Sequence, residues 1–99
     1  MLKQYIYRNR NGKRQRVGVL VGTTVKNQIV LGYSLCCPED TFDRDKGLAI
    51  ALGRALSPKQ IGCPPSIEND VWDFALRCIR YFKDARIFDE NDDFNMIGE

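Results

Sequence analysis

The sequence predicts a single α+β domain, in which a three-stranded antiparallel β-meander precedes two α-helices packed on one face of the sheet, followed by a flexible acidic C-terminal tail. Three observations indicate this fold class. The first part of the chain alternates β-favouring runs with turn residues, the middle carries apolar residues at helical spacing, and the end is rich in acids. We expect the domain to span residues 1–88 and the tail to span residues 89–99.

Strands are predicted at about residues 3–8, 15–22 and 28–35. Tyr5 and Tyr7 belong to an aromatic and β-branched run of the kind that favours a strand. Asn11-Gly12 then favours positive φ at both central positions, which suits a type I′ hairpin turn. A polar connection over residues 23–27 separates the second strand from the third. Because such short connections join only antiparallel neighbours, the three strands are expected to form a meander.

Helices are predicted at about residues 41–56 and 67–85. Asp40 or Thr41 is expected to cap the first helix by accepting a hydrogen bond from an amide of its first turn. Ser66 is the expected cap of the second helix. Apolar side chains recur every three or four residues in both segments, so one face of each helix is expected to be buried. Glycines in the strands, such as Gly32, are expected to let a helix approach the sheet closely.

The composition excludes several common chemistries. The chain has no histidine, which removes Ser-His-Asp and Cys-His catalysis and every zinc site that contains histidine. The cysteines lack the C-x₂-C spacing of zinc sites, and no Gly-rich phosphate loop occurs. We therefore expect no metal and no cofactor. Because cytosolic thiols usually stay reduced, free thiols are expected at Cys36, Cys37, Cys63 and Cys78.

Aspartates near the predicted start of the first helix provide the one enzymatic alternative. Asp43-x-Asp45-x-Gly47 resembles the start of a calcium loop, but Arg54 stands where that loop requires a glutamate. Capping of the helix explains these carboxylates better. A pair formed by Asp40 and Asp43 around a metal stays open as a remote option. The sequence as a whole predicts that the protein is not an enzyme.

The hydropathy pattern predicts a cytoplasmic protein with no membrane partner. No apolar run reaches the roughly 18 residues that a membrane helix needs. The N-terminus MLKQYIYRNR lacks the apolar core of a signal peptide.

The two ends of the chain carry opposite charges, although the net charge is only +2. Residues 1–26 contain basic side chains and no acid. Basic groups around a hairpin turn can neutralise phosphates, and exposed tyrosines can stack on bases. The predicted binding residues are Tyr5, Tyr7, Arg8, Arg10, Lys13, Arg14 and Arg16. The competing interpretation is that these charges keep an exposed hairpin soluble and protect its edge from pairing.

The acidic end is a second candidate binding surface. Its predicted binding residues are Asp89, Glu90, Asp92 and Asp93. The segment can also be simple solvated disorder, can fold back on the basic hairpin, or can imitate a nucleic-acid backbone toward a basic partner.

The run GYSLCCPEDTFDRDKGLAIALGRA, from Gly32 to Ala55, resembles small proteins encoded by bacteriophages and related mobile elements. The likeness extends back to residues 16–21 and forward to residues 80–83, and covers about half of the chain. The resemblance implies a protein that acts stoichiometrically by binding a host protein or a nucleic acid, and it brings no catalytic residue with it.

Two hypotheses of function follow from the sequence. The first is a non-enzymatic phage-type accessory protein that binds and modulates a host macromolecule in the host cytoplasm, with inhibition of a defence nuclease as one form of this activity. The alternative is a direct nucleic-acid-binding module that uses the basic N-terminal hairpin.

Overall fold

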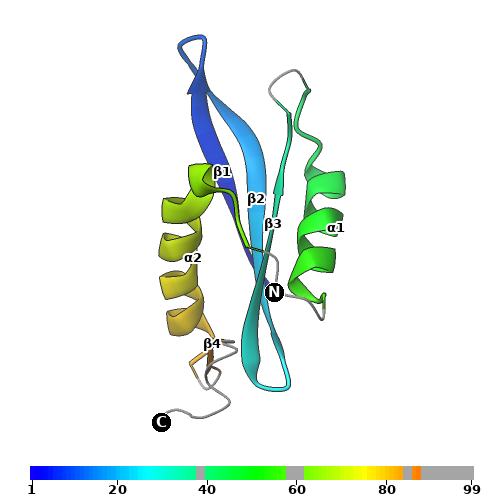
Figure 1. Cartoon of the computed structure of the whole chain (residues 1–99), viewed down its shortest axis with the longest axis vertical. Helices are drawn as coiled ribbons and strands as arrows, with labels where there is room; N and C mark the ends of the chain where they lie inside the picture. Colours follow the sequence, from blue (N-terminus) through cyan, green and yellow to red (C-terminus); the bar gives the residue numbers. More distant parts are fainter. Residues whose placement is uncertain (38–39, 58–61, 84–85, 88–99) are drawn as a thin grey trace.

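The computed structural model describes residues 1–37, 40–57, 62–83 and 86–87. Within these residues a mixed sheet lies between two helices (Figure 1). The predicted antiparallel three-stranded meander, followed by two helices packed against the sheet, is confirmed. The elements are β1 (Leu2–Arg10), β2 (Lys13–Val25), β3 (Gln28–Leu35), α1 (Arg44–Ala55), a 3₁₀ turn (Pro65–Ile67), α2 (Glu68–Tyr81) and β4 (Arg86–Ile87). The predicted acidic tail, residues 89–99, lies outside the described residues.

The β1–β2 hairpin forms at the predicted turn. Asn11 and Gly12 both adopt positive φ, of 52° and 78°, as the type I′ prediction requires. The connection from β2 to β3 is shorter than predicted, because β2 continues to Val25 and pairs there with Gln28. A second turn is left at Lys26 and Asn27, which also have positive φ, of 51° and 65°.

The two helices lie on opposite faces of the sheet, so the prediction that both pack on one face is wrong. Val19 and Val21 of β2 pack with Ala51 of α1, whereas Leu20 packs with Phe74 of α2. Successive side chains of a strand point to opposite faces. Because β2 carries buried apolar side chains on both faces, each face of the sheet must be covered by a helix.

Glycines allow each helix to approach the sheet, as predicted. A Cβ atom built on Gly32 would meet backbone atoms of Ala51 and Ala55 in α1. A Cβ atom built on Gly22 would lie 2.5 Å from Cys78 Sγ in α2. The two glycines are therefore needed on opposite faces, one for each helix.

The helix starts differ from the prediction. Helix α1 begins at Arg44, and its cap is Asp43, whose Oδ1 accepts a hydrogen bond from the Lys46 amide at 3.1 Å. The predicted caps Asp40 and Thr41 are thus wrong. Ser66 is not the cap of α2 either, because the residues before that helix form a 3₁₀ turn and Ile67 precedes the first helical residue.

The end of the described chain adds a strand that the sequence did not predict. Helix α2 ends at Tyr81, earlier than the predicted residue 85. Two residues of β4 then pair parallel to β3, with Arg86 opposite Gln28 and Ile87 opposite Ile29. The order in the sheet is β1-β2-β3-β4. A strand of two residues has no sequence periodicity that could distinguish it from a loop.

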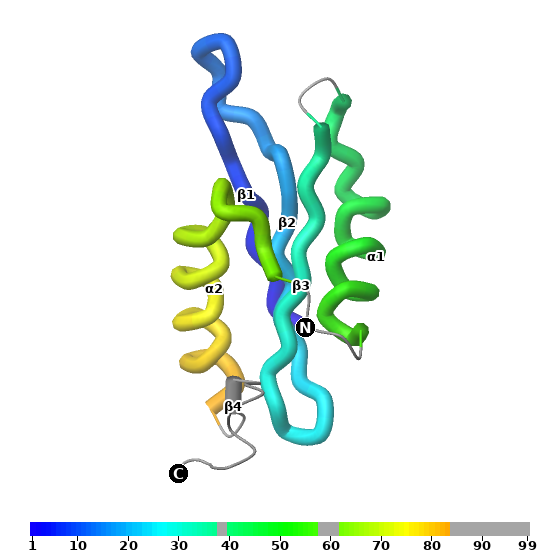
Figure 2. The backbone as a smooth tube through the Cα atoms, in the orientation of Figure 1, coloured from blue at the N-terminus to red at the C-terminus, as the bar shows by residue number. Residues whose placement is uncertain are grey.

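The hairpin tip and the start of α1 lie at the same end of the molecule, as the chain trace in Figure 2 shows. The β2–β3 turn lies at the opposite end, near the end of α2. No helix in the described ranges is long and apolar enough to cross a membrane.

Candidate binding surface on the N-terminal hairpin

A β-bulge in the hairpin determines which face its arginines occupy. Ile6 lies opposite Gly18, but the next residue, Tyr7, lies opposite Arg16. Val17 is therefore an extra residue of β2 with no partner in the register with β1. Because side chains alternate between faces, one extra residue exchanges the faces of everything beyond it.

The bulge places arginines and tyrosines on the same face. Tyr5 and Tyr7, two residues apart on β1, share a face, and cross-strand partners share a face as well. With the bulge, Arg16 is opposite Tyr7 and Arg14 is opposite Asn9. Without it, this face would carry Val17 and Gln15 in place of the two arginines. Gly18 was the available sequence signal, because a glycine inside a strand often marks a bulge.

The four side chains form an alternating stack, here named the Arg–Tyr ladder (Tyr5, Tyr7, Arg14 and Arg16). The Arg16 guanidinium carbon lies 4.0 Å from the centroid of the Tyr5 ring, and that of Arg14 lies 4.3 Å from the centroid of the Tyr7 ring. Both distances are well inside the range of cation–π attraction. Lys3 Nζ, 5.9 Å from the Tyr5 centroid, extends the row toward the N-terminus.

An open groove runs beside the ladder. The Phe42 ring meets the Tyr5 ring edge to face, with centroids 6.2 Å apart and an angle of 84° between the planes. This contact fixes the segment before α1 next to the hairpin. The groove has a volume of about 560 Å³, and its lining residues are Tyr7, Arg10, Gln15, Arg16, Asp40, Thr41 and Phe42. Phe42 was not among the predicted binding residues, because nothing in the local sequence places it beside β1.

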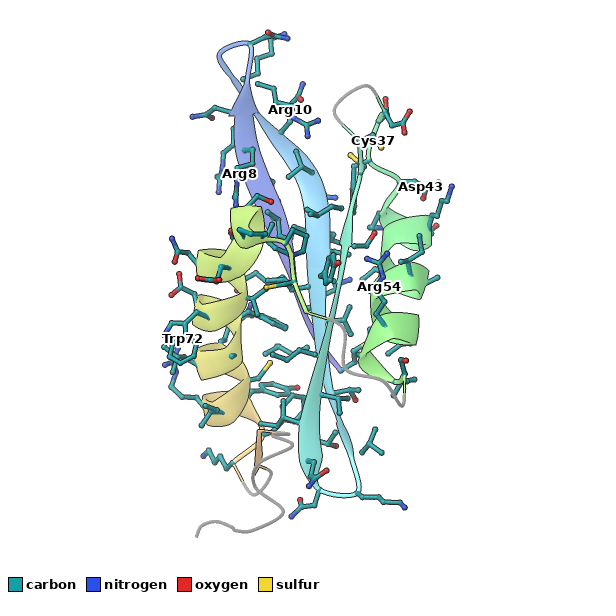
Figure 3. All side chains as sticks on the ribbon, viewed as in Figure 1. Arg8, Arg10, Cys37, Asp43, Arg54 and Trp72 are labelled. Carbon is teal, nitrogen blue, oxygen red and sulfur yellow. The ribbon has the colours of Figure 1, made fainter. Side chains whose placement is uncertain are left out.

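Arg8 is separated from the ladder and bound within the chain. Its guanidinium forms an ion pair with Asp70 of α2, with Nη2 2.5 Å from Oδ1, and donates to the Ser66 carbonyl at 2.8 Å. The hydrogen bond with Asp70 raises the pKa of Arg8 above its ordinary value. Figure 3 shows Arg8 on the α2 side of the hairpin. Arg8 thus connects the hairpin to the start of α2, a contact that the sequence did not predict.

The remaining predicted binding residues lie near the turn or outside the description. Arg10 lines the groove, and Lys13 is exposed opposite it in the register. None of the ion pairs in the described part of the chain involves Arg10, Lys13, Arg14 or Arg16. The predicted acidic binding residues 89–93 belong to the segment that is not described.

The cysteines and the aspartates near the start of α1 form no cluster that could hold a metal ion within the described residues. All four cysteines are free, with Cys37 exposed and Cys78 buried on the inner face of α2. Burial raises the pKa of the Cys78 thiol to about 11. Asp43 is occupied as the cap of α1, while Asp40 lines the groove. The described residues contain no group of three or more histidine, cysteine or acidic side chains that could hold a metal ion.

The ladder can bind anions and flat aromatic groups. Each ladder guanidinium lies over a tyrosine ring, and both arginines are exposed to solvent. A guanidinium donates hydrogen bonds along its edge to phosphate oxygens, and its free face can stack on a base. The groove next to Arg16 adds the aromatic side chain of Phe42 and the polar side chains of Gln15 and Thr41 to its lining.

Comparison of the chain with models of known protein families, with curated proteins and with solved structures gives no match. The resemblance to bacteriophage proteins therefore stays a prediction. The proposal of function rests on the chemistry of the Arg–Tyr ladder and its groove.

Proposed function

We propose that this protein is a nucleic-acid-binding module and that the Arg–Tyr ladder is its contact surface. The single observation that carries the proposal is the stacking of Arg16 on Tyr5 and of Arg14 on Tyr7 on one face of the hairpin, where both arginines are exposed and both tyrosines are half-buried. Positive charge alone is also expected of a hairpin whose basic residues serve only to keep it soluble. Ordered stacking is more than solubility requires, because a solvated arginine needs no fixed position.

The stacking prepares the arginines for phosphate binding. A free arginine side chain loses up to about 2 kcal/mol of rotamer entropy when a ligand fixes it. The tyrosine rings already hold the guanidinium groups of Arg14 and Arg16, so less freedom is left to lose. No ion pair in the described chain competes for them. Both features raise the affinity of the surface for a polyanion.

The shape of the hairpin is compatible with two kinds of nucleic acid. The tip of the β1–β2 hairpin extends beyond the start of α2 (Figure 1). A two-stranded β-ribbon fits the major groove of a DNA duplex. A single strand can instead follow the ladder, with phosphates on the arginines and a base in the groove beside Phe42. Binding measurements with duplex and single-stranded probes distinguish these two kinds of nucleic acid.

The hypothesis of a phage-type accessory protein that modulates a host macromolecule stays a prediction. Its acidic binding residues lie outside the described part of the chain, so the argument for that surface rests on sequence alone. The function proposed here is the alternative to it, a direct nucleic-acid-binding module that uses the basic N-terminal hairpin.

Fluorescence anisotropy with labelled single-stranded DNA, duplex DNA and single-stranded RNA tests the proposal. The unchanged protein is expected to bind at least one probe at low salt, and the double variant R14A/R16A to bind that probe at least about tenfold more weakly. The matched control K26A/K83A removes the same charge from the far end of the molecule and should bind within about twofold. Absence of binding to all probes at low salt would refute the proposal.

A further inference from the structure

The outer face of α2 carries an exposed apolar stripe that the hairpin surface does not explain. Trp72, Leu76 and Ile79 are 68%, 42% and 44% exposed, whereas Phe74 and Cys78 on the inner face are fully buried. Figure 3 shows Trp72 pointing away from the sheet. The spacing of these residues, four and then three apart, places them on one side of a helix. Helix α2 is thus apolar on two sides.

This stripe is separate from the proposed nucleic-acid surface. The ladder residue Tyr5 belongs to the face of the sheet that α1 covers, whereas α2 covers the other face. A contiguous exposed apolar surface on a small protein commonly marks a site of protein association. The charged residues beside the stripe indicate which partner fits this surface.

The charged residues of α2 are segregated along the helix. Its first half has Glu68 and Asp73, its last turn has Arg80, and Lys83 follows the helix. The other two charges nearby are engaged within the chain: Asp70 pairs with Arg8, and Arg77 donates to Gln4 Oε1 at 2.8 Å. Asp73 and Arg80 are exposed and take part in none of the ion pairs of the described residues.

We infer that the occupant of the stripe is the same stripe on a second copy of this chain, with the two α2 helices antiparallel. Asp73 and Arg80 are seven residues apart, which is two helical turns, so they lie on the same flank of the stripe. Trp72 and Ile79 have the same spacing on the other flank. Leu76 lies between the two pairs.

A two-fold axis near Leu76 makes this pattern self-complementary. The axis places Leu76 against Leu76 of the second copy and Trp72 against Ile79 of the second copy. It also places Asp73 of each copy against Arg80 of the other, so that one ion pair forms twice. A parallel two-fold arrangement would place the charged flank of each copy against Trp72 and Ile79 of the other, so the ion pairs would not form. The pattern therefore selects a symmetric antiparallel dimer, and it does not depend on the proposed nucleic-acid binding.

Sedimentation velocity of the full chain over a range of concentrations tests the dimer. The sedimentation coefficient is expected to rise with concentration from that of a monomer to that of a dimer. The single tryptophan of the chain is Trp72, so its emission should shift to shorter wavelength over the same range. The variant W72E, which places a charge in the stripe, should remain monomeric, with circular dichroism as the check on folding.

Charge exchange supplies the sharper test. The variants D73R and R80D each replace two attractive contacts by two repulsive ones, and each should raise the dissociation constant by roughly tenfold or more. In an equimolar mixture, a dimer of one D73R chain with one R80D chain brings the introduced arginine against the introduced aspartate. The other contact of that mixed dimer joins the two unchanged residues, Arg80 and Asp73, so both contacts are attractive and dimerisation should be regained.

Three results would overturn the inference. A monomer at every concentration excludes the dimer, and if Trp72 emission is then already at short wavelength, the stripe is covered within the chain. A mixture of D73R and R80D that associates no better than either variant alone excludes the antiparallel pairing. A W72E dimer places the interface elsewhere.

Discussion

Tyr7 lies opposite Arg16 across the hairpin because Val17 is an extra residue of β2. This pairing determines which side chains lie on the same face as Tyr5 and Tyr7. A regular register, with Tyr7 opposite Val17, would place the ladder arginines on the face of Arg8 and leave the tyrosines opposite neutral side chains. The bulge therefore accounts for the separation of the basic residues into those that stack on tyrosines and Arg8, which pairs with Asp70.

Replacing the ladder arginines by lysines is expected to weaken nucleic-acid binding without changing the net charge. The double variant R14K/R16K keeps both cations but loses the planar groups that stack on Tyr7 and Tyr5. A loss of about 0.5–1 kcal/mol of binding free energy per site is expected. Equal affinities of the two proteins in an anisotropy titration would show that the surface acts through charge alone.

Arg8 is expected to contribute to stability more than to binding. Because the Arg8–Asp70 pair is partly exposed, with side-chain exposures of 40% and 27%, the variant R8A should lose only about 1 kcal/mol of unfolding free energy. Urea denaturation of R8A, D70N and the double variant measures the coupling between the two residues. Nucleic-acid affinity of R8A should fall by no more than about twofold. If R8A lost as much nucleic-acid affinity as R14A/R16A, Arg8 would belong to the binding surface after all.

Two glycine substitutions should change stability in opposite directions. In G32A the new methyl group meets the backbone of α1 at Ala51 and Ala55, so a loss of about 1–3 kcal/mol is expected. In G53A the methyl group meets nothing within 4 Å, and the exposed helical position should gain up to about 1 kcal/mol. Thermal unfolding of both variants checks the prediction. A neutral G32A would mean that α1 does not lie so close to β3.

Stability is expected to fall at high pH because of Cys78. Burial raises the pKa of this thiol from its ordinary value of 9.0 to about 11 in the folded protein. The unfolded chain therefore releases the proton first, and stability is lost as the pH rises from about 9 to about 11. Urea denaturation at several pH values should show a steeper decline for the unchanged protein than for C78A. If the stability of both proteins fell equally with rising pH, Cys78 would not be the cause of the decline.

The sequence predicted the elements whose signals are local. Asn11-Gly12 has the composition of a type I′ turn, and the turn occurs there. The apolar spacing in residues 67–85 predicted a helix with one buried face, and Phe74 and Cys78 are buried on that face. Helix starts were less accurate, because Asp40, Thr41 and Asp43 are all residues that cap helices well, and the structure has Asp43 as the cap.

The features that depend on distant contacts were not predictable. The periodicity of Val19, Leu20 and Val21 is consistent with burial on one face or on both, so the opposite placement of the helices was missed. The bulge at Val17 depends on pairing with β1, and the Arg8–Asp70 contact joins residues 62 positions apart. The residues of the ladder were named from the sequence, but their alignment on a single face was not.

The salt dependence of nucleic-acid binding tests the central claim most directly. The logarithm of the association constant should fall linearly with the logarithm of salt concentration, and R14A/R16A should reduce this slope by about 1.4 on a single strand or about 1.8 on a duplex. The control K26A/K83A should keep the slope of the unchanged protein. Equal slopes for all three proteins would show that Arg14 and Arg16 do not contact phosphates, and would contradict the assignment of the Arg–Tyr ladder as the binding surface.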